Sequence, residues 1–211
     1  MKKTRNAKPR LGRPPDTDSA DTRERILDIA RLAFAQRGYE AATNRNLGAE
    51  AGITAGAIYH YFGSKLDLYI AVHDDVQARV YRRFSDAVTA PPTFRGKLEA
   101  VLDEAHVMND EDPTLAQFLG ALRVDMRRHD ELRQALLPSA LLRQQFFDRI
   151  VDAGLESGEI DPVDREKMSA LLLTLLIGLS DDALSGDPLH HSHAVAGIKS
   201  LVEGKLVHLI D

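Results

Sequence analysis

Apolar residues recur at helical spacing along nearly the whole chain. In segment 21–37, Ile26, Ala30 and Ala33 share one face, which predicts an amphipathic helix that ends at Gly38. No segment shows the sustained alternation of a strand bounded by turn residues. The pattern therefore predicts an all-α protein.

Two short helices are expected next, over residues 43–50 and 54–61. Gly52 lies between them, where a left-handed residue can end the first helix. Leu47 and Ile58 are the inward apolar positions of the pair. Two short helices joined by a tight turn form a helix-turn-helix, whose second helix can enter the major groove of DNA.

A long helix should follow the pair. Ser64 and Asp67 have the spacing of a capping box. Behind them Val72, Val76 and Phe84 continue an apolar stripe at intervals of four residues or multiples of four, and the helix should end before Pro91. Further helices are predicted at about 93–109, 113–128, 130–136, 139–157, 163–184 and 190–208.

The domain organisation follows from these elements. Residues 1–20 are rich in proline and basic residues and are expected to be a disordered basic arm. Residues 21–66 should form an N-terminal three-helix unit that contains the helix-turn-helix. Residues 67–211 should form a larger helical body.

Charge is distributed unevenly between these parts. The net charge is −5, from 27 Lys and Arg against 32 Asp and Glu. Residues 1–65 contain 12 basic and 7 acidic side chains, whereas residues 66–211 contain 15 and 25. A basic front on an acidic body favours a polyanion such as DNA as partner, although a solvated tail would also explain the arm.

Composition excludes several other classes of protein. The 211 residues include no cysteine, which excludes disulfides, thiolate metal sites and a cysteine nucleophile. The longest apolar stretch, 170–179, is too short to span a membrane, so the sequence predicts a soluble, cytoplasmic protein with no membrane partner. No paired carboxylates, nucleophile–base pair or phosphate loop stands out, so neither an enzyme nor a cofactor is predicted.

The run from Ala51 to Lys65, AGITAGAIYHYFGSK, resembles the signature of the TetR family of transcriptional regulators. The upstream Ala33-Phe34 and Gly38-Tyr39 match it as well, so the resemblance covers roughly residues 21–70. The motif is more specific than a general helix-turn-helix pattern. The rest of the chain resembles the family in helical character and length.

The resemblance implies which residues touch DNA. They lie in the first turn of the first short helix, on the second short helix and just after it: Thr43, Asn44, Arg45, Thr54, Ala55, Gly56, Tyr59, His60 and Lys65. Ala55 replaces a frequent lysine, so Arg45 becomes the best candidate for a bidentate guanine contact. Alternatives remain for two of these residues: Arg45 as a solvated surface charge and Tyr59 as ordinary packing at the helix end.

The arm offers a second DNA element. Gly12-Arg13-Pro14 resembles the core of a minor-groove hook, but Leu11 stands where an arginine is expected. Arg10 and Arg13 could enter a narrow minor groove. General affinity for phosphate is the preferred interpretation.

The body should contain a dimer surface and a ligand pocket. Segment 163–184 is apolar nearly all round and is expected to be buried on every side. In the TetR family the last two long helices pair with their copies, which implies a homodimer through 163–184 and 190–208; burial within one subunit is the alternative. Apolar candidates for a pocket are Met108, Phe118, Met126, Phe146 and Phe147, with His106, Arg123 and His129 as polar partners unless they are surface residues.

The cluster His190-His191-Ser192-His193 is weak evidence for a metal, because no carboxylate or cysteine partner has ligand spacing. A solvated loop at the start of a helix is the preferred interpretation, and no metal site is predicted.

These features predict a dimeric, ligand-responsive DNA-binding regulator, a repressor that a small-molecule effector of unknown identity releases from its double-stranded operator. Ligand would shift the spacing of the two second helices away from half-sites about 34–36 Å apart. One rival is a helical enzyme or protein-interaction module that keeps the helix-turn-helix as a scaffold. Another is a ligand-independent architectural regulator, which a body without a cavity would favour.

Overall fold

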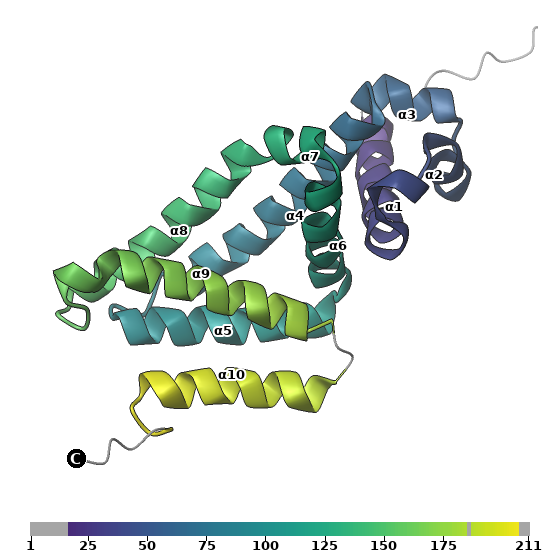
Figure 1. Cartoon of the computed structure of the whole chain (residues 1–211). Coiled ribbons are helices and arrows are strands. Elements are labelled where there is room, and N and C mark those ends of the chain that lie inside the picture. Colours follow the sequence, from purple (N-terminus) through teal and green to yellow (C-terminus); the bar gives the residue numbers. More distant parts are fainter. Residues whose placement is uncertain (1–16, 185–186, 207–211) are drawn as a thin grey trace, which may run out of the picture.

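The computed structural model describes residues 17–184 and 187–206, and this part of the chain contains helices and no strand (Figure 1). The all-α prediction is confirmed. In chain order the helices are α1 (Thr17–Ala41), α2 (Asn44–Ala51), α3 (Ala55–Phe62), α4 (Lys65–Ala87), α5 (Phe94–Glu111), α6 (Thr114–Arg128), α7 (Asp130–Ala135), α8 (Leu137–Glu156), the 3₁₀ turn η1 (Pro162–Asp164), α9 (Arg165–Asp182) and α10 (Pro188–Val202).

Three predicted boundaries were wrong. Helix α1 begins at Thr17 rather than at residue 21, because no proline or glycine interrupts the chain between Asp16 and Gly38. Pro138 does not separate helices but lies in the first turn of α8, where its missing N–H costs nothing. Helix α10 ends at Val202, so Leu206 lies outside it. Arg10 and Arg13 of the basic arm lie outside the described residues.

Side-chain caps explain where the N-terminal helices start. The hydroxyl oxygens of Thr43, Thr54 and Thr93 each accept the main-chain N–H three residues later. The capping box is confirmed: the Asp67 N–H donates to Ser64 Oγ at 3.0 Å, and Ser64 Oγ donates to Asp67 Oδ2 at 2.6 Å.

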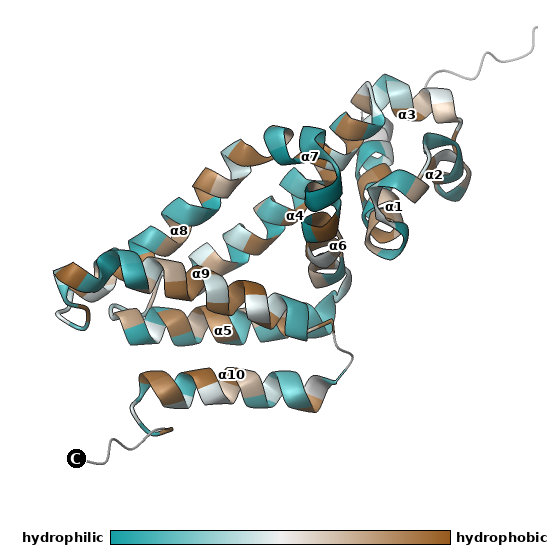
Figure 2. Cartoon of the chain, in the orientation of Figure 1, coloured by the Kyte–Doolittle hydropathy of each residue, from teal (hydrophilic) through white to brown (hydrophobic). Residues whose placement is uncertain are grey.

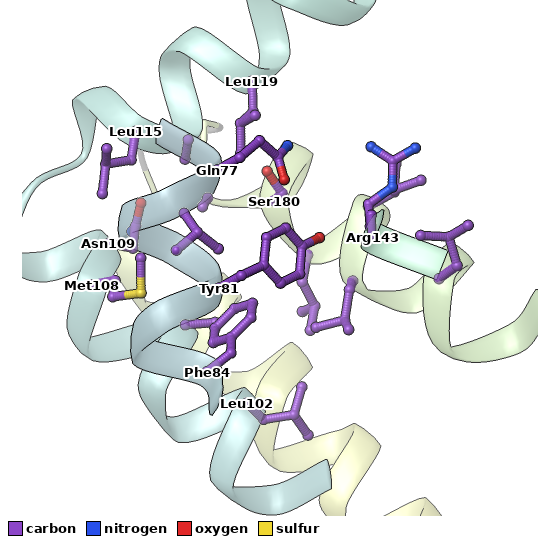
Figure 3. A pocket seen from close by; sticks show the side chains of 18 of the residues that line it. Gln77, Tyr81, Phe84, Leu102, Met108, Asn109, Leu115, Leu119, Arg143 and Ser180 are labelled. Atoms are coloured by element: carbon purple, nitrogen blue, oxygen red, sulfur yellow. The ribbon is translucent and has the colours of Figure 1, made fainter. Parts of the chain in front are cut away.

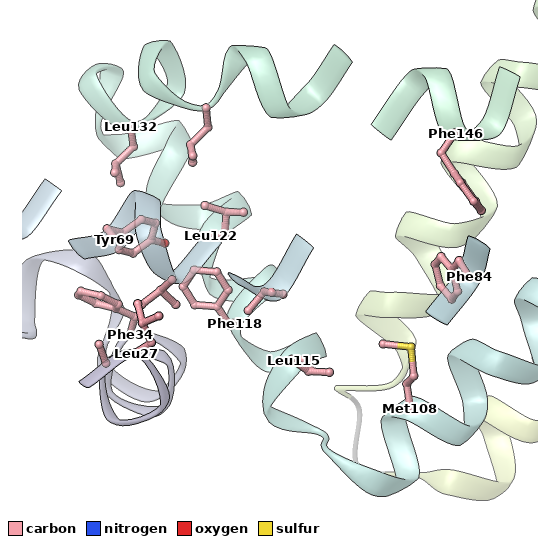
Figure 4. Packing of buried hydrophobic residues seen from close by; sticks show 14 of the residues in the cluster. Leu27, Phe34, Tyr69, Phe84, Met108, Leu115, Phe118, Leu122, Leu132 and Phe146 are labelled. Carbon is pink, nitrogen blue, oxygen red and sulfur yellow. The ribbon is translucent and has the colours of Figure 1, made fainter. Parts of the chain in front are cut away.

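The N-terminal unit packs against the body through α1, α4 and α6. Phe34 of α1 lies 4.6 Å from Tyr69 of α4 between ring centroids, and Tyr69 lies 5.4 Å from Phe118 of α6 (Figure 4). All three side chains are buried. A continuous apolar core therefore joins the unit to the body.

Helix α4 connects the two parts without a break. Its N-terminal half packs against α1, and its C-terminal half carries Tyr81 and Phe84 into the body. Figure 1 shows it running from the α1–α3 unit to the lower layer of α5, α9 and α10.

Helix α9 is less buried in one chain than its composition predicted. Leu171 is 49% exposed and Ile177 is 36% exposed, whereas Leu172 and Leu179 are buried. The expectation of burial on every side is therefore wrong for a single chain, because the packing of α9 on α8, α6 and α10 leaves part of its apolar surface uncovered. Helix α10 lies at the edge of the body and adds exposed Leu189 and Leu201, so apolar residues reach the surface on both helices (Figure 2).

Within the described residues, no helix is both long enough and apolar enough to cross a membrane.

Candidate functional site

Helices α2 and α3 form the predicted helix-turn-helix. Gly52 ends α2 in the left-handed region at φ 68° and ψ 28°, which a residue with a Cβ rarely adopts. The Ile53 N–H donates to Gly48 O at 2.9 Å and closes the turn. Leu47 and Ile58 are buried, as expected, and fix the two helices on α1.

Two polar links hold this unit in place. Arg37 of α1 donates to both carboxylate oxygens of Glu50 at 2.8 and 2.9 Å, a bidentate pair that ties α2 to the end of α1. Lys65 Nζ donates to the carbonyls of Tyr39 and Glu40 at 3.0 and 3.3 Å and lies 4.3 Å from the centroid of the Tyr39 ring. Lys65, which the resemblance implies touches DNA, is therefore engaged within the protein.

Most of the predicted DNA-contacting residues lie at the surface of the helix-turn-helix. Tyr59 is 54% exposed, which excludes the alternative that it simply packs the helix end. Ala55 is half-buried. The other exposed members of the set are Thr43, Arg45, Thr54, Gly56 and His60.

Asn44 departs from this pattern. It is 7% exposed, and neither its Oδ1 nor its Nδ2 has a hydrogen-bond partner. As the first residue of α2 its side chain turns into the protein, so the predicted DNA contact by this side chain is wrong for the conformation described.

An ion-pair chain links the unit to the body. Arg31 of α1 is 7% exposed, and its Nη2 lies 3.1 Å from Asp112 Oδ2, at the junction of α5 and α6. The same nitrogen lies 3.5 Å from Asp28, which also pairs with Arg79 of α4 at 3.3 Å. Arg31 therefore links α1 to Asp112, which also lines a cavity in the body.

The body encloses a cavity of about 150 Å³ among α4, α5, α6, α8, α9 and α10 (Figure 3). Most of its wall is apolar. Of the predicted pocket residues, Met108 and Phe147 line it, and Arg123 is the one predicted polar partner that does so.

The other predicted pocket residues lie elsewhere. Phe118 belongs to the core between α1 and α4, and Phe146 stacks on Phe84 with 6.0 Å between ring centroids, behind the cavity wall. Met126 is half-buried and does not line the cavity. Phe146 and Phe147 point about 100° apart on α8, and Phe147 is the one that faces the cavity.

The two remaining histidine candidates also lie outside the cavity. His129 lies beside Glu40, with 3.9 Å between Nε2 and Oε2, and edge-on to Tyr39. His106 stacks on His191 with 5.8 Å between ring centroids.

Seven further polar residues of the cavity wall were not predicted from the sequence as pocket residues: Gln77, Tyr81, Asn109, Asp112, Arg143, Ser180 and His191. Gln77 and Tyr81 are four residues apart on α4, directly after the apolar positions Val76 and Val80. Two polar residues four positions apart, next to a stripe of buried apolar residues, could have indicated from the sequence that this side of α4 lines a cavity. No comparable pattern marks Arg143, because the sequence does not reveal how α8 is rotated about its axis.

Burial changes the pKa values of two titratable side chains near Arg143. Burial raises the pKa of the Tyr81 hydroxyl well above its ordinary range, although the nearby positive charge of Arg143 opposes the shift. Burial also lowers the pKa of His73, although a hydrogen bond from the charged ring to the Asp74 carboxylate opposes the shift. Both groups are therefore neutral at pH 7.

The histidine cluster is not a solvated loop throughout. His191 is 6% exposed, with its Nδ1 3.2 Å from Asp182 Oδ2, and His190 Nε2 lies 3.2 Å from the other oxygen of Asp182. The expectation of solvation is wrong for His191, because Asp182 draws it against the end of α9. Among the described residues, no group of three or more His, Asp or Glu side chains is placed to hold a metal ion.

An exposed helix-turn-helix joined by one continuous helix to a body with an internal cavity defines a DNA-binding transcriptional regulator. Residues 26–72 match the family model described as bacterial regulatory proteins, tetR family. The helix-turn-helix unit of this chain is therefore similar to that of the TetR family. Regulators of this family are transcription factors rather than enzymes, so the helical-enzyme alternative is not supported.

Several known proteins resemble the chain. It is 23% identical over 191 residues to the HTH-type transcriptional regulator UidR of Escherichia coli K12, which covers 90% of this chain and 95% of UidR. It is 43% identical over 79 residues to the HTH-type transcriptional repressor AcnR of Corynebacterium glutamicum, covering 37% and 42% of the two chains. The crystal structure of FadR from Bacillus subtilis in complex with stearoyl-CoA has a TM-score of 0.74 at 23% identity and covers 88% of this chain and 99% of that one.

Proposed function

We propose that this regulator is a homodimeric repressor that a small organic effector, bound in the body cavity, releases from its DNA operator. The observation that carries the proposal is the cavity, because a wall shared by α4 and the α5–α6 junction connects it directly to the DNA-binding unit. The repressor AcnR and the ligand-bound FadR, each named above, support the two parts of the proposal by analogy. A regulator without an effector would have no need of the cavity.

The proposed DNA-binding unit spans residues 21–66, and the effector-binding and dimerisation body spans 67–211. Arg45 and Thr54 are exposed at the starts of α2 and α3, where they can reach base edges. Tyr59 and His60 are exposed further along α3, within reach of phosphates. Lys65 contributes by holding α4 on the end of α1 and by adding positive charge beside this surface.

The proposed dimer forms through α9 and α10. Two copies are needed because a helix-turn-helix dimer reads two half-sites about 34–36 Å apart. The exposed apolar side chains Leu171 and Ile177 of α9 and Leu189 and Leu201 of α10 are the surface that a second copy would cover.

The proposed route from effector to DNA has two structural parts. Asp112 lines the cavity and pairs with Arg31 of α1, and Gln77 and Tyr81 line it from α4. An effector that binds better to one arrangement of α4 and the α5–α6 junction shifts the population toward that arrangement. Release follows when the favoured arrangement no longer places the two α3 helices on successive turns of the operator.

Selection from a random pool of duplex DNA tests the DNA-binding half of the proposal. We expect enrichment of a two-fold symmetric sequence with half-sites about ten base pairs apart, bound with a steep negative dependence on salt. Recovery of no sequence above the starting pool would contradict it. Screening small organic compounds for release of the selected DNA tests the effector half, and insensitivity to every ligand that binds the cavity would contradict that half.

A further inference from the structure

The charged side chains of the cavity wall differ in whether they have partners. Arg123 pairs with Asp181, Asp112 pairs with Arg31, and His191 pairs with Asp182. Arg143 forms no ion pair with any residue in the described part of the chain. It therefore contributes a positive charge to the cavity that the protein itself leaves without a carboxylate.

Part of the Arg143 side chain is also shielded from solvent. Its Nε is shielded from solvent and has no hydrogen-bond partner. Its charge acts on half-buried Tyr81 and on buried His73, both neutral, and neither supplies a negative charge to compensate it. Arg143 is half-buried, and a guanidinium that is partly shielded from water at a cavity wall, without a carboxylate partner, favours an anion in that cavity.

The surrounding groups complete a polar end. Figure 3 shows the Tyr81 hydroxyl directed toward the side of the cavity on which Arg143 lies. Ser180 Oγ, on α9, is also buried without a hydrogen-bond partner. The Arg143 guanidinium and the Tyr81 hydroxyl supply several donors for a carboxylate-sized group, and Ser180 Oγ adds a further donor to the cavity wall.

Apolar side chains make up most of the remaining wall, which Gln77, Asn109 and Asp112 also line. Leu115 and Leu119 of α6, Met108 of α5 and Leu173 and Leu176 of α9 surround the remaining space. A ligand with charge at both ends would leave one charge against these side chains, so the wall favours a single polar head and an apolar body.

Resting on the proposed function, we propose that the effector is an amphipathic organic monoanion whose carboxylate-like head binds Arg143 and whose apolar body fills the space lined by α5, α6 and α9. A space of about 150 Å³ holds roughly ten water-sized spheres. A ligand of about ten non-hydrogen atoms therefore suits it, a size that octanoate has.

Titration of the purified full-length protein, without DNA, with octanoate, octanamide and octylammonium tests this inference. The three probes have similar length and differ in the charge of the head. We expect octanoate to bind at least about tenfold more tightly than octanamide, and octylammonium to bind more weakly than both. Equal or tighter binding of octanamide or octylammonium, or no binding of octanoate at millimolar concentration, would overturn the proposal.

Variants of α8 locate the anion. Arg143→Gln should remove the preference for octanoate over octanamide, and Arg143→Lys should restore part of it. Arg149→Gln, which removes the same charge from an exposed position of the same helix, should bind like the parent. Far-ultraviolet circular dichroism checks that each variant is folded, and a preference for octanoate that survives in folded Arg143→Gln would also overturn the assignment.

DNA release is measured separately, on the selected operator. If octanoate binds through Arg143 but leaves the operator complex intact, the monoanion site stands and the proposed effector-dependent release fails. If another ligand releases DNA while octanoate shows no preference, the release mechanism stands and the monoanion inference fails.

Discussion

Asp125 of α6 accepts the main-chain N–H of Tyr39, at the end of α1, with 2.9 Å between Oδ2 and N. The same oxygen accepts the hydroxyl of Tyr69 at 3.0 Å, and the carboxylate is 5% exposed. One buried carboxylate of the body thus holds the end of α1, from which the chain continues into the helix-turn-helix.

Asp125→Ala should destabilise the protein by about 1–3 kcal/mol, because it leaves two buried donors without an acceptor. Urea unfolding measures this change. Asp130→Ala is the matched control, since the Asp130 side chain is 86% exposed and its pair with Arg133 contributes little. Equal losses in the two variants would contradict the role given to Asp125.

The pH dependence of stability should carry the signature of His73. Burial holds the pKa of this ring below its ordinary value of about 6.5, so in acid the unfolded chain takes up a proton that the folded protein does not. The free energy of unfolding should therefore fall as pH drops from about 7 toward 5, with a slope of up to about 1.4 kcal/mol per pH unit from this group.

Chemical unfolding at several pH values, for the parent and for His73→Gln, isolates that contribution. Whatever the stability of the variant at pH 7, its loss of stability between pH 7 and 5 should be smaller than that of the parent. His193→Gln, at an exposed position, should retain the slope of the parent. Identical slopes in the parent and His73→Gln would show that another group is responsible.

Arg45→Ala should weaken binding to the selected operator by about 1–3 kcal/mol and relax the preference at one base pair of each half-site. Tyr59→Phe should instead weaken binding to all sequences alike, because a lost phosphate contact carries no base information. Fluorescence anisotropy with operator and single-base variants distinguishes the two effects. An unchanged base preference in Arg45→Ala would favour the alternative that Arg45 is a solvated surface charge that does not contact a base.

Leu171→Glu should convert the protein to a monomer and abolish specific DNA binding, because it places a charge on the exposed apolar side of α9. Leu142→Glu introduces the same charge at a site on α8 that is 68% exposed, and it should remain dimeric. Sedimentation velocity gives the masses. A dimeric Leu171→Glu protein would place the interface elsewhere.

The helix-turn-helix could be predicted from the sequence because its signals are local. Thr43 and Thr54 cap α2 and α3 within three residues of themselves, and Gly52 supplies its own left-handed turn. The engagement of Lys65 could not be predicted, because its acceptors lie 25 and 26 residues away on α1.

The cavity was predicted less well for a related reason. Its wall is drawn from six helices, and membership depends on how each is rotated about its axis. That rotation separates Phe147, which lines the cavity, from its neighbour Phe146, which packs on Phe84. The rotation of α8 also places Arg143 at the cavity wall and Arg149 at the surface. This difference between the two arginines cannot be read from a single sequence.

The 23 residues of α4 form an uninterrupted rod about 34 Å long, with Tyr81 beside the cavity near one end and Lys65 beside the DNA-binding unit at the other. A tilt of about 5° at the cavity end displaces the far end by about 3 Å, comparable to the rise between base pairs in duplex DNA. An effector that tilts α4 by this amount would therefore move the DNA-binding unit by about one base-pair step, a displacement that a flexible linker could not transmit.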